Sequence, residues 1–171
     1  HCVGEGSRAM APCPERVEML ADRLTKQVAL RRSKVFERRV GIVLFGPLEE
    51  HSINDYSKSL NINLLGSFIT SRILITDMIK RGSGSIINMS SINGINPGIG
   101  IGAYPASKAG IISMTQQMAI EWGKFGIRVN CISPGFIKTA MTDKIDDKFK
   151  EVILSKIPSE RLGEPNDIAN A

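Results

Sequence analysis

The hydrophobic positions of the chain alternate between helical spacing and short apolar runs. Within residues 53–80, apolar side chains recur at helical intervals, at Leu60, Leu64, Phe68, Ile69, Ile73 and Ile79. Gly82 and Gly84 follow this stretch, as glycines commonly do after the end of a helix. The pattern therefore predicts one long helix over about residues 53–80.

Two apolar runs of strand length flank a second helical stretch. Residues 85–90 and 127–133 are the two runs, and residues 104–124 between them have helical periodicity. A glycine-rich loop, residues 93–102, joins the first run to this helix. Because a strand–helix–strand order is typical of parallel sheets covered by helices, the pattern predicts an α/β fold.

The two ends of the chain have weaker patterns. Pro14 suits the first turn of a helix, and apolar residues follow at helical spacing, at Val17, Leu20, Leu24 and Val28. Residues 42–45 form a short apolar run before Gly46. Residues 140–171 are polar and helical in tendency.

Composition indicates a single globular domain. The chain has 171 residues, of which 42% are hydrophobic and 23% are charged, and these are ordinary values for a protein that buries a core. We treat residues 1–171 as one domain in which residues 1–40 are atypical. Apolar runs of roughly 18 residues, as in membrane spans, and the features of a signal peptide are not found. We therefore expect a cytoplasmic protein with no membrane partner.

Cysteine and histidine are too sparse to indicate a metal site. Cys2, Cys13 and Cys131 form no C-x-x-C pair. His1 and His51 are isolated from each other and from the cysteines. We expect neither a bound metal nor a disulfide framework.

Basic residues are concentrated near the N-terminus. Residues 1–41 hold nine Lys/Arg and five Asp/Glu, a net charge of +4 out of +5 for the whole chain. A basic segment is one signal of nucleic-acid binding. Because the only aromatic residue in this segment is Phe36, we favour a solvated helix face and expect no nucleic-acid partner.

Tyr104 and Lys108 are the residues that carry the most chemical information. They lie four positions apart at the start of the helix predicted for residues 104–124, so they share one face. A free tyrosine, with a pKa of about 10, exchanges protons poorly near neutrality. A cation beside the phenol is expected to lower that pKa toward the range where general acid–base catalysis is effective. Tyr–Lys pairs at this spacing are also common on solvated helix surfaces. The neighbouring motifs therefore decide between a catalytic pair and a surface pair.

Three further motifs surround this pair. Ser91 follows the first predicted strand and lies 13 positions before Tyr104. Asn63 lies within Leu60-Asn61-Ile62-Asn63-Leu64-Leu65-Gly66 in the long predicted helix. Pro134 and Gly135 follow the second predicted strand. Taken singly, such residues are more often helix caps or satisfied polar groups, so their order and spacing carry the signal.

From about Gly41 to Ala171, these motifs resemble the classical short-chain dehydrogenase/reductase family. Within that family the chain is similar to bacterial carrier-protein 3-oxoacyl reductases and to sugar-acid dehydrogenases. The resemblance implies a Rossmann-like, doubly wound parallel sheet. It also implies an NAD(P)-dependent oxidoreductase that interconverts a carbonyl and a secondary alcohol by hydride transfer.

The resemblance assigns four catalytic residues. Tyr104 would exchange the proton with the substrate oxygen, and Ser91 would donate a hydrogen bond to that oxygen. Lys108 would tune Tyr104 and bind the nicotinamide ribose. Asn63 would hold a water that links Lys108 to solvent.

It also assigns the residues that bind the cofactor, NAD or NADP. Besides Tyr104 and Lys108 these are Pro134, Gly135, Ile137 and Thr139, which would approach the nicotinamide. The segment 140–171 corresponds to a mobile lid over the substrate, a small carbonyl or alcohol compound.

The chain departs from the family near its N-terminus. The family's T-G-x-x-x-G-x-G turn has no counterpart, and residues 38–41, where N-N-A-G is expected, are Arg38-Arg39-Val40-Gly41. We therefore expect the sheet without its first β-α-β unit and without its last strand. The adenosine half of the cofactor site has no support in the sequence, and the choice between NAD and NADP stays open.

Three explanations of this departure stay open. The sequence is incomplete, or it is frameshifted up to about residue 40, or it is a truncated relative. The third explanation leads to a different class of function, a non-catalytic interaction or scaffold protein. We favour the enzyme, because the catalytic positions are intact.

The helices predicted for residues 54–80 and 104–124 have apolar side chains on more than one face. A helix of this kind is buried by something. In the resembled family these two helices pair with a second subunit, so we expect a homodimer or a homotetramer. The alternative is burial within a core formed by this chain alone.

Overall fold

Two parallel strands and the helix that connects them form the centre of the fold in the computed structural model, which describes residues 41–139, 142 and 146–171. Strands β1 (Gly84–Met89) and β2 (Ile127–Ile132) are paired in register from Gly84 opposite Ile127 to Met89 opposite Ile132. The helix α4 (Tyr104–Trp122) lies between them in the chain, and the short 3-10 helix η4 (Gly123–Phe125) follows it. The predicted strand–helix–strand unit is confirmed to within about two residues at each boundary.

A continuous helical stretch precedes β1. It consists of α2 (Ile53–Leu60), a π-helical turn η2 (Asn61–Leu65) and α3 (Gly66–Arg81). Ser52 caps its start, since its side chain accepts a hydrogen bond from the Asp55 amide at 3.1 Å. Gly82 ends it in the left-handed conformation, with φ 65°. The long helix predicted from the hydrophobic spacing is therefore confirmed. The helix expected from Pro14 lies outside the described residues.

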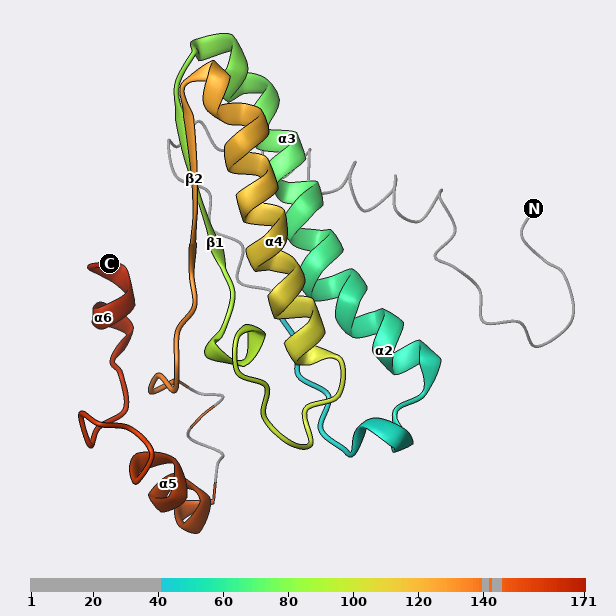
Figure 1. Cartoon of the computed structure of the whole chain (residues 1–171), viewed down its shortest axis with the longest axis vertical. Helices are drawn as coiled ribbons and strands as arrows, with labels where there is room; N and C mark the ends of the chain where they lie inside the picture. Colours follow the sequence, from blue (N-terminus) through green and yellow to red (C-terminus); the bar gives the residue numbers. More distant parts are fainter. Residues whose placement is uncertain (1–40, 140–141, 143–145) are drawn as a thin grey trace, which may run out of the picture.

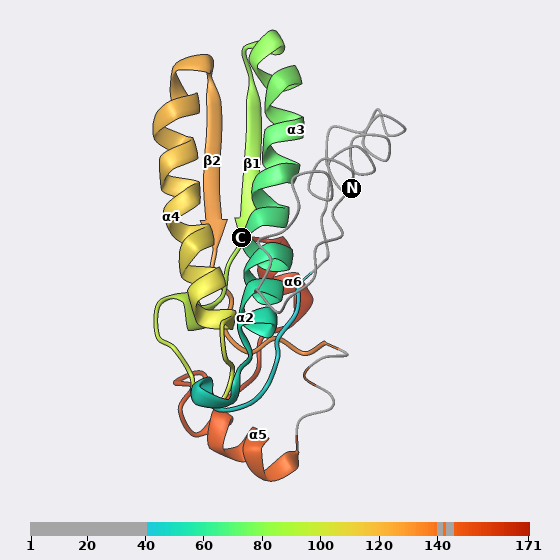
Figure 2. The same ribbon diagram turned by 90° about the vertical axis from the view of Figure 1, so that its right-hand side faces the viewer.

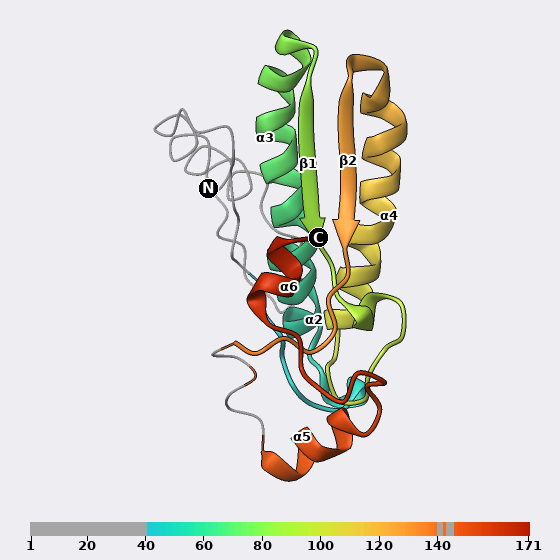
Figure 3. The same cartoon turned by 90° about the vertical axis from the view of Figure 1, so that its left-hand side faces the viewer.

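Helices α3 and α4 lie side by side on one face of the two strands (Figure 1, Figure 2). Alternate residues of each strand point into this helical layer. The residues that form the buried core between the layers are Ile75, Ile86, Met118, Ile127 and Val129. On the opposite face, turned toward the viewer in Figure 3, Ile87 and Met89 are largely exposed among the described residues.

The remaining short elements gather beyond the carboxyl ends of the strands (Figure 1, Figure 3). These elements are the 3-10 helices η1 (Leu48–Glu50) and η3 (Ile92–Gly94) and the helices α5 (Asp147–Leu154) and α6 (Pro165–Ala169). Two isolated parallel bridges connect their loops, Gly46 with Ile101 and Ile137 with Gly163. The polar C-terminal segment is therefore helical in part, as its sequence indicates.

Among the described residues, the stretch Ile53–Arg81 has the length and apolar composition of a membrane-crossing helix. A helix in the core of a soluble protein meets the same criteria. Here the stretch contacts β1 and contains the buried polar side chains of Asn63, Thr70 and Ser71. We interpret it as a core helix of this α/β fold.

Truncation of Met118 tests this core. Met118 on α4 is 4% exposed and packs in the core with residues of both strands. Met118→Ala should therefore lower the free energy of unfolding by about 2–5 kcal/mol, because contacts are lost and a cavity remains. Denaturant unfolding measures this change. Gln116→Ala, at an exposed position on the same helix, should change it by less than about 0.5 kcal/mol, and equal effects of the two variants would contradict the assignment of the core.

Candidate active site

The loops that leave β1 and β2 stay hydrogen-bonded to each other. The Ser90 amide donates to the Ile132 carbonyl at 2.8 Å, and the Ile92 amide donates to the Pro134 carbonyl at 2.8 Å. Ser91 lies between these two bonds, so the structure places it beside the Pro134 turn. Ligands of open α/β sheets bind in this position, outside the carboxyl ends of parallel strands.

Tyr104 is the first residue of α4, and its phenol reaches Ser91. Burial raises the pKa of Tyr104 above its usual value, and the hydrogen bond with the Ser91 side chain lowers it by a smaller amount. The Ser91 hydroxyl also accepts a hydrogen bond from the Asn93 amide at 3.2 Å, which fixes its position at the start of η3. The two hydroxyls expected at the reacting oxygen are therefore adjacent.

Lys108 completes this cluster one helical turn further along α4. Its ammonium Nζ lies 5.5 Å from the centroid of the Tyr104 ring, within the range of a cation–π interaction. The same Nζ donates a hydrogen bond to the Met89 carbonyl at the end of β1, at 3.0 Å. Ser91, Tyr104 and Lys108 thus converge, as the resemblance to the short-chain dehydrogenase/reductase family implies.

The expectation of a lowered tyrosine pKa is wrong for this structure. Lys108 is close to Tyr104, yet the net shift of the Tyr104 pKa is upward. The physical reason is that removing the phenol from water penalises the charged tyrosinate more than its partners stabilise it. The phenol of Tyr104 therefore keeps its proton to a higher pH than a free tyrosine does.

Asn63 lies in the π-helical turn η2 and is 2% exposed. Its amide group is bonded to Ile42 twice, since Oδ1 accepts from the Ile42 amide and Nδ2 donates to the Ile42 carbonyl, both at 2.9 Å. Nδ2 also donates to the Ser107 hydroxyl at 3.0 Å, and that hydroxyl donates to the Tyr104 carbonyl at 2.7 Å. The structure therefore connects the Asn63 side chain to the backbone of Tyr104. Its expected role toward Lys108 stays a prediction.

The four other candidate cofactor residues lie along the segment after β2. Gly135 is exposed, and a Cβ at this position would meet nothing within 4 Å. Ile137 pairs with Gly163 in an isolated bridge, and Gly163 approaches the Ile137 side chain too closely for a Cβ. Thr139 is exposed, and its amide donates to the Thr142 hydroxyl at 2.8 Å. Pro134 therefore lies next to Ser91 in space, because its carbonyl accepts from the Ile92 amide, while Ile137 and Thr139 lie in the segment that leads to α5. The binding of a cofactor by these four residues stays a prediction.

Three further residues support the site, and the sequence analysis did not single them out as site residues. Ser107 is fully buried between Asn63 and Tyr104. The Ser90 hydroxyl donates to the Lys108 carbonyl at 2.8 Å. A Cβ on Gly94 would lie 2.8 Å from the Lys108 carbonyl carbon, so only glycine lets this loop contact α4 so closely. The glycine-rich composition of the loop was a signal for Gly94, whereas serine is too common in loops and helices to signal Ser90 or Ser107.

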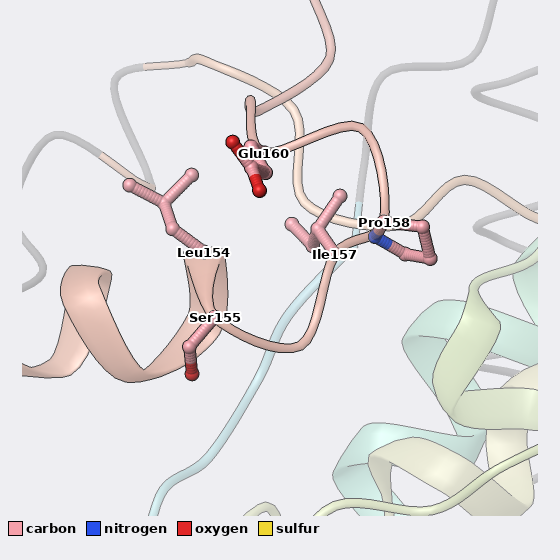
Figure 4. Close-up of a pocket in the computed structure, with 5 residues that line it drawn as sticks. All are labelled: Leu154, Ser155, Ile157, Pro158 and Glu160. Carbon is pink, nitrogen blue, oxygen red and sulfur yellow. The ribbon is translucent and has the colours of Figure 1, made fainter.

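Two open hollows lie away from these residues. One, of about 440 Å³, is lined by Val43, Leu44, Phe45, Gly46, Glu50, His51 and Asp55. The other, of about 350 Å³, follows α5 and is lined by Leu154, Ser155, Ile157, Pro158 and Glu160 (Figure 4). Neither hollow is lined by Ser91, Tyr104 or Lys108. We therefore place the candidate active site at these three side chains and not at a hollow.

Comparison with known proteins identifies the class. Residues 12–171 match the family model described as enoyl-(acyl carrier protein) reductase. The chain is 47% identical over 117 residues to the 3-oxoacyl-[acyl-carrier-protein] reductase of Rickettsia felis, which covers 68% of this chain and 48% of that protein. It is 41% identical over 138 residues to the enzyme of the same description from Thermotoga maritima, covering 81% of this chain and 56% of that protein.

Solved structures agree with this result. A 3-oxoacyl-[acyl-carrier protein] reductase from Brucella melitensis superposes with a TM-score of 0.82 at 28% identity, covering 88% of this chain and 59% of that one. A proposed NAD(P)-dependent gluconate 5-dehydrogenase from Beutenbergia cavernae, with bound NADP at low occupancy, gives a TM-score of 0.81 at 33% identity, covering 88% and 61%. The chain belongs to the short-chain dehydrogenase/reductase family, and its Rossmann-like fold is confirmed. It spans about half the length of the relatives that it matches in sequence.

Gly94→Ala tests the contact between η3 and α4. The added methyl group would collide with the backbone at Lys108 and Ala109, so the free energy of unfolding should fall by about 1–3 kcal/mol. Gly123→Ala is the matched control, because a Cβ there meets nothing within 4 Å and a glycine-to-alanine change without strain stabilises by about 0.4–1 kcal/mol. Denaturant unfolding should show opposite signs, and a stabilising Gly94→Ala would contradict the close contact.

Proposed function

We propose that this protein is an NAD(P)-dependent oxidoreductase that interconverts a carbonyl and a secondary alcohol. The observation that carries the proposal is the convergence of the Ser91 hydroxyl, the Tyr104 phenol and the Lys108 ammonium at the carboxyl ends of two parallel strands. Relatives described as 3-oxoacyl-[acyl-carrier-protein] reductases and a solved structure with bound NADP support it.

The described residues fit the nicotinamide half of the cofactor. Tyr104 and Lys108 present a hydroxyl and a cation that suit the ribose hydroxyls, and the open space at Gly135 suits a flat ring close to the backbone. Pro134, Ile137 and Thr139 would line the same side. When bound, the cofactor supplies the hydride that reduces the substrate carbon.

The side chains of this site would handle the proton and the developing charge. In the reducing direction, Ser91 donates a hydrogen bond to the substrate oxygen, where negative charge develops. Tyr104 transfers its phenol proton to that oxygen, and its raised pKa keeps the proton in place until then. Lys108 stabilises the resulting tyrosinate from one helical turn away.

Among substrates, the surface near the site favours a 3-oxoacyl thioester over a sugar acid. The loops 41–52 and 92–103 are joined through the Gly46–Ile101 bridge just before Tyr104. Several apolar side chains of these loops are exposed, namely Phe45, Leu48, Ile92, Ile95 and Ile99. An acyl chain can cover such a rim and gain hydrophobic stabilisation, which a polyhydroxy acid cannot.

We also propose that two copies of the chain associate through α3 and α4. Ile120 on α4 lies on the side opposite the buried Met118 and is 82% exposed, and on α3 Phe68 and Ile79 are 40% and 38% exposed. Exposed apolar groups on neighbouring helices are typical of an interface between subunits. The assembly would be a homodimer or a homotetramer. We also propose a cytoplasmic location.

Replacing Tyr104 with Phe removes the proton donor and leaves the ring. Turnover of a 3-oxoacyl thioester with NADPH or NADH should fall by about 10²–10⁴-fold, while cofactor binding, followed by the fluorescence of the reduced cofactor, should persist. Tyr56→Phe is the control, because Tyr56 lies on α2 and should keep full activity. Undiminished turnover of Tyr104→Phe would remove the catalytic assignment.

The pH profile checks the same residue with a defined sign. Because Tyr104 donates its proton during reduction and its pKa is raised, kcat/KM for reduction should stay level through neutrality. It should fall only as pH rises through a value above that of free tyrosine. The free energy of unfolding should also fall as pH rises through this value. The reason is that a group whose pKa is raised on folding stabilises the fold only while it is protonated.

A charge placed on the outer side of α4 tests the proposed association. Ile120→Glu should raise the dissociation constant of the assembly at least about tenfold, because a carboxylate would be buried without a partner. Sedimentation velocity over a range of concentrations measures this change. Val152→Glu on α5, also an exposed apolar position, should leave the assembly unchanged, and equal sedimentation of both variants and the parent would contradict the interface.

A further inference from the structure

His51 fills a gap between the two loops that meet just before α4. It follows η1, and its amide donates to the Leu48 carbonyl at 3.2 Å. Its imidazole ring lies against Gly102, where a Cβ would collide with three atoms of the ring, and close to Gly46, where a Cβ would lie 3.6 Å from Nε2. The ring therefore occupies space that only a glycine at position 102 leaves open, whereas a Cβ at Gly46 would be in ordinary van der Waals contact with it.

The same two loops are bonded to each other beside this ring. The Gly46 amide donates to the Gly100 carbonyl at 3.0 Å, next to the bridge between Gly46 and Ile101. Gly46 and Gly102 have φ of 143° and 48°, in the region that favours glycine. The backbone on both sides of His51 is thus held in conformations that larger residues rarely adopt.

The contacts of His51 with these glycines are made by its ring. Its Nε2 is buried and has no hydrogen-bond partner among the described residues. Leaving a polar atom unpaired in the interior is unfavourable, whereas an apolar group of the same shape carries no such penalty. Among the described residues the contacts of this ring are therefore packing contacts, which a flat ring without a nitrogen would keep.

The loop that the ring supports leads directly into Tyr104. The Tyr104 amide donates to the Ile101 carbonyl at 3.1 Å, and Ala103 between them is 1% exposed. A displacement of residues 100–102 therefore moves the first turn of α4 and the phenol that meets Ser91. Errors of about 1 Å at a reacting group can cost about 10²-fold in rate.

We propose that His51 is a positioning residue for Tyr104. Its ring sets the position of residues 100–102, and this loop places the phenol against Ser91. The proposal rests on the proposed function only for its effect on turnover, because the placement of Tyr104 can also be measured without turnover.

The experiment compares His51→Ala, His51→Leu and His51→Phe in the full-length protein. His51→Ala and His51→Leu should lower kcat for carbonyl reduction about 10–100-fold with KM for the nucleotide nearly unchanged. His51→Phe, which restores a flat ring without a nitrogen, should recover kcat to within about threefold of the parent. If His51→Ala does not fold, the contrast between the Leu and Phe variants gives the same comparison.

A second readout follows the Tyr104 phenol directly. The chain has two tyrosines, so in a Tyr56→Phe background the ultraviolet absorbance of tyrosinate reports Tyr104 alone. His51→Ala should shift this titration toward the value of an exposed tyrosine, and His51→Phe should restore it. A shift and rescue with no turnover in any form would support the positioning role and remove the proposed function.

Two outcomes would overturn the inference. If His51→Phe is as impaired as His51→Ala, the imidazole nitrogen is used, for example by a substrate group in the adjoining hollow near Glu50 and Asp55. If His51→Ala keeps the parent's kcat and tyrosine titration, the ring does not position Tyr104.

Discussion

The attachment of the end of β1 to the first turns of α4 is the constraint on which the site depends. At Lys108 this attachment is made twice, because its carbonyl accepts from the Ser90 hydroxyl at 2.8 Å and its ammonium donates to the Met89 carbonyl at 3.0 Å. Gly94 lets the loop between them approach the helix backbone. Ser91 is thereby fixed beside Tyr104, so one short contact region aligns residues from a strand end and from a helix.

A second set of bonds connects the first turn of α4 to the long helix before β1. Asn63, in the π-helical turn between α2 and α3, connects the backbone of Ile42 to Ser107, and Ser107 is bonded to the Tyr104 carbonyl. π-helical turns are rare overall, and those that occur are frequently found at functional sites. Tyr104 is therefore held by β1 and by the long helix together, and this is the rigid support that its proposed role as a proton donor requires.

Burial has a double effect at this site. It provides the low-dielectric surroundings in which hydrogen bonds and charges act strongly. It also raises the pKa of Tyr104, against the expectation that Lys108 would lower it. The neighbouring loops, with Phe45 and Ile99 exposed, meet just before Tyr104, so the proposed reaction centre lies near exposed apolar side chains.

The sequence by itself determined the order of elements and the identity of the chemical groups. Hydrophobic spacing predicted the long helix and the strand–helix–strand unit, and the interval from Tyr104 to Lys108 predicted their common face, because these are local properties of the chain. Only the tertiary structure decided the direction of the tyrosine pKa shift, the bonding of Asn63 to Ser107, and the packing of His51 between Gly46 and Gly102. Each of these depends on which residues, far apart in the sequence, are buried in contact with each other. The spacing of residues along the chain does not determine such contacts.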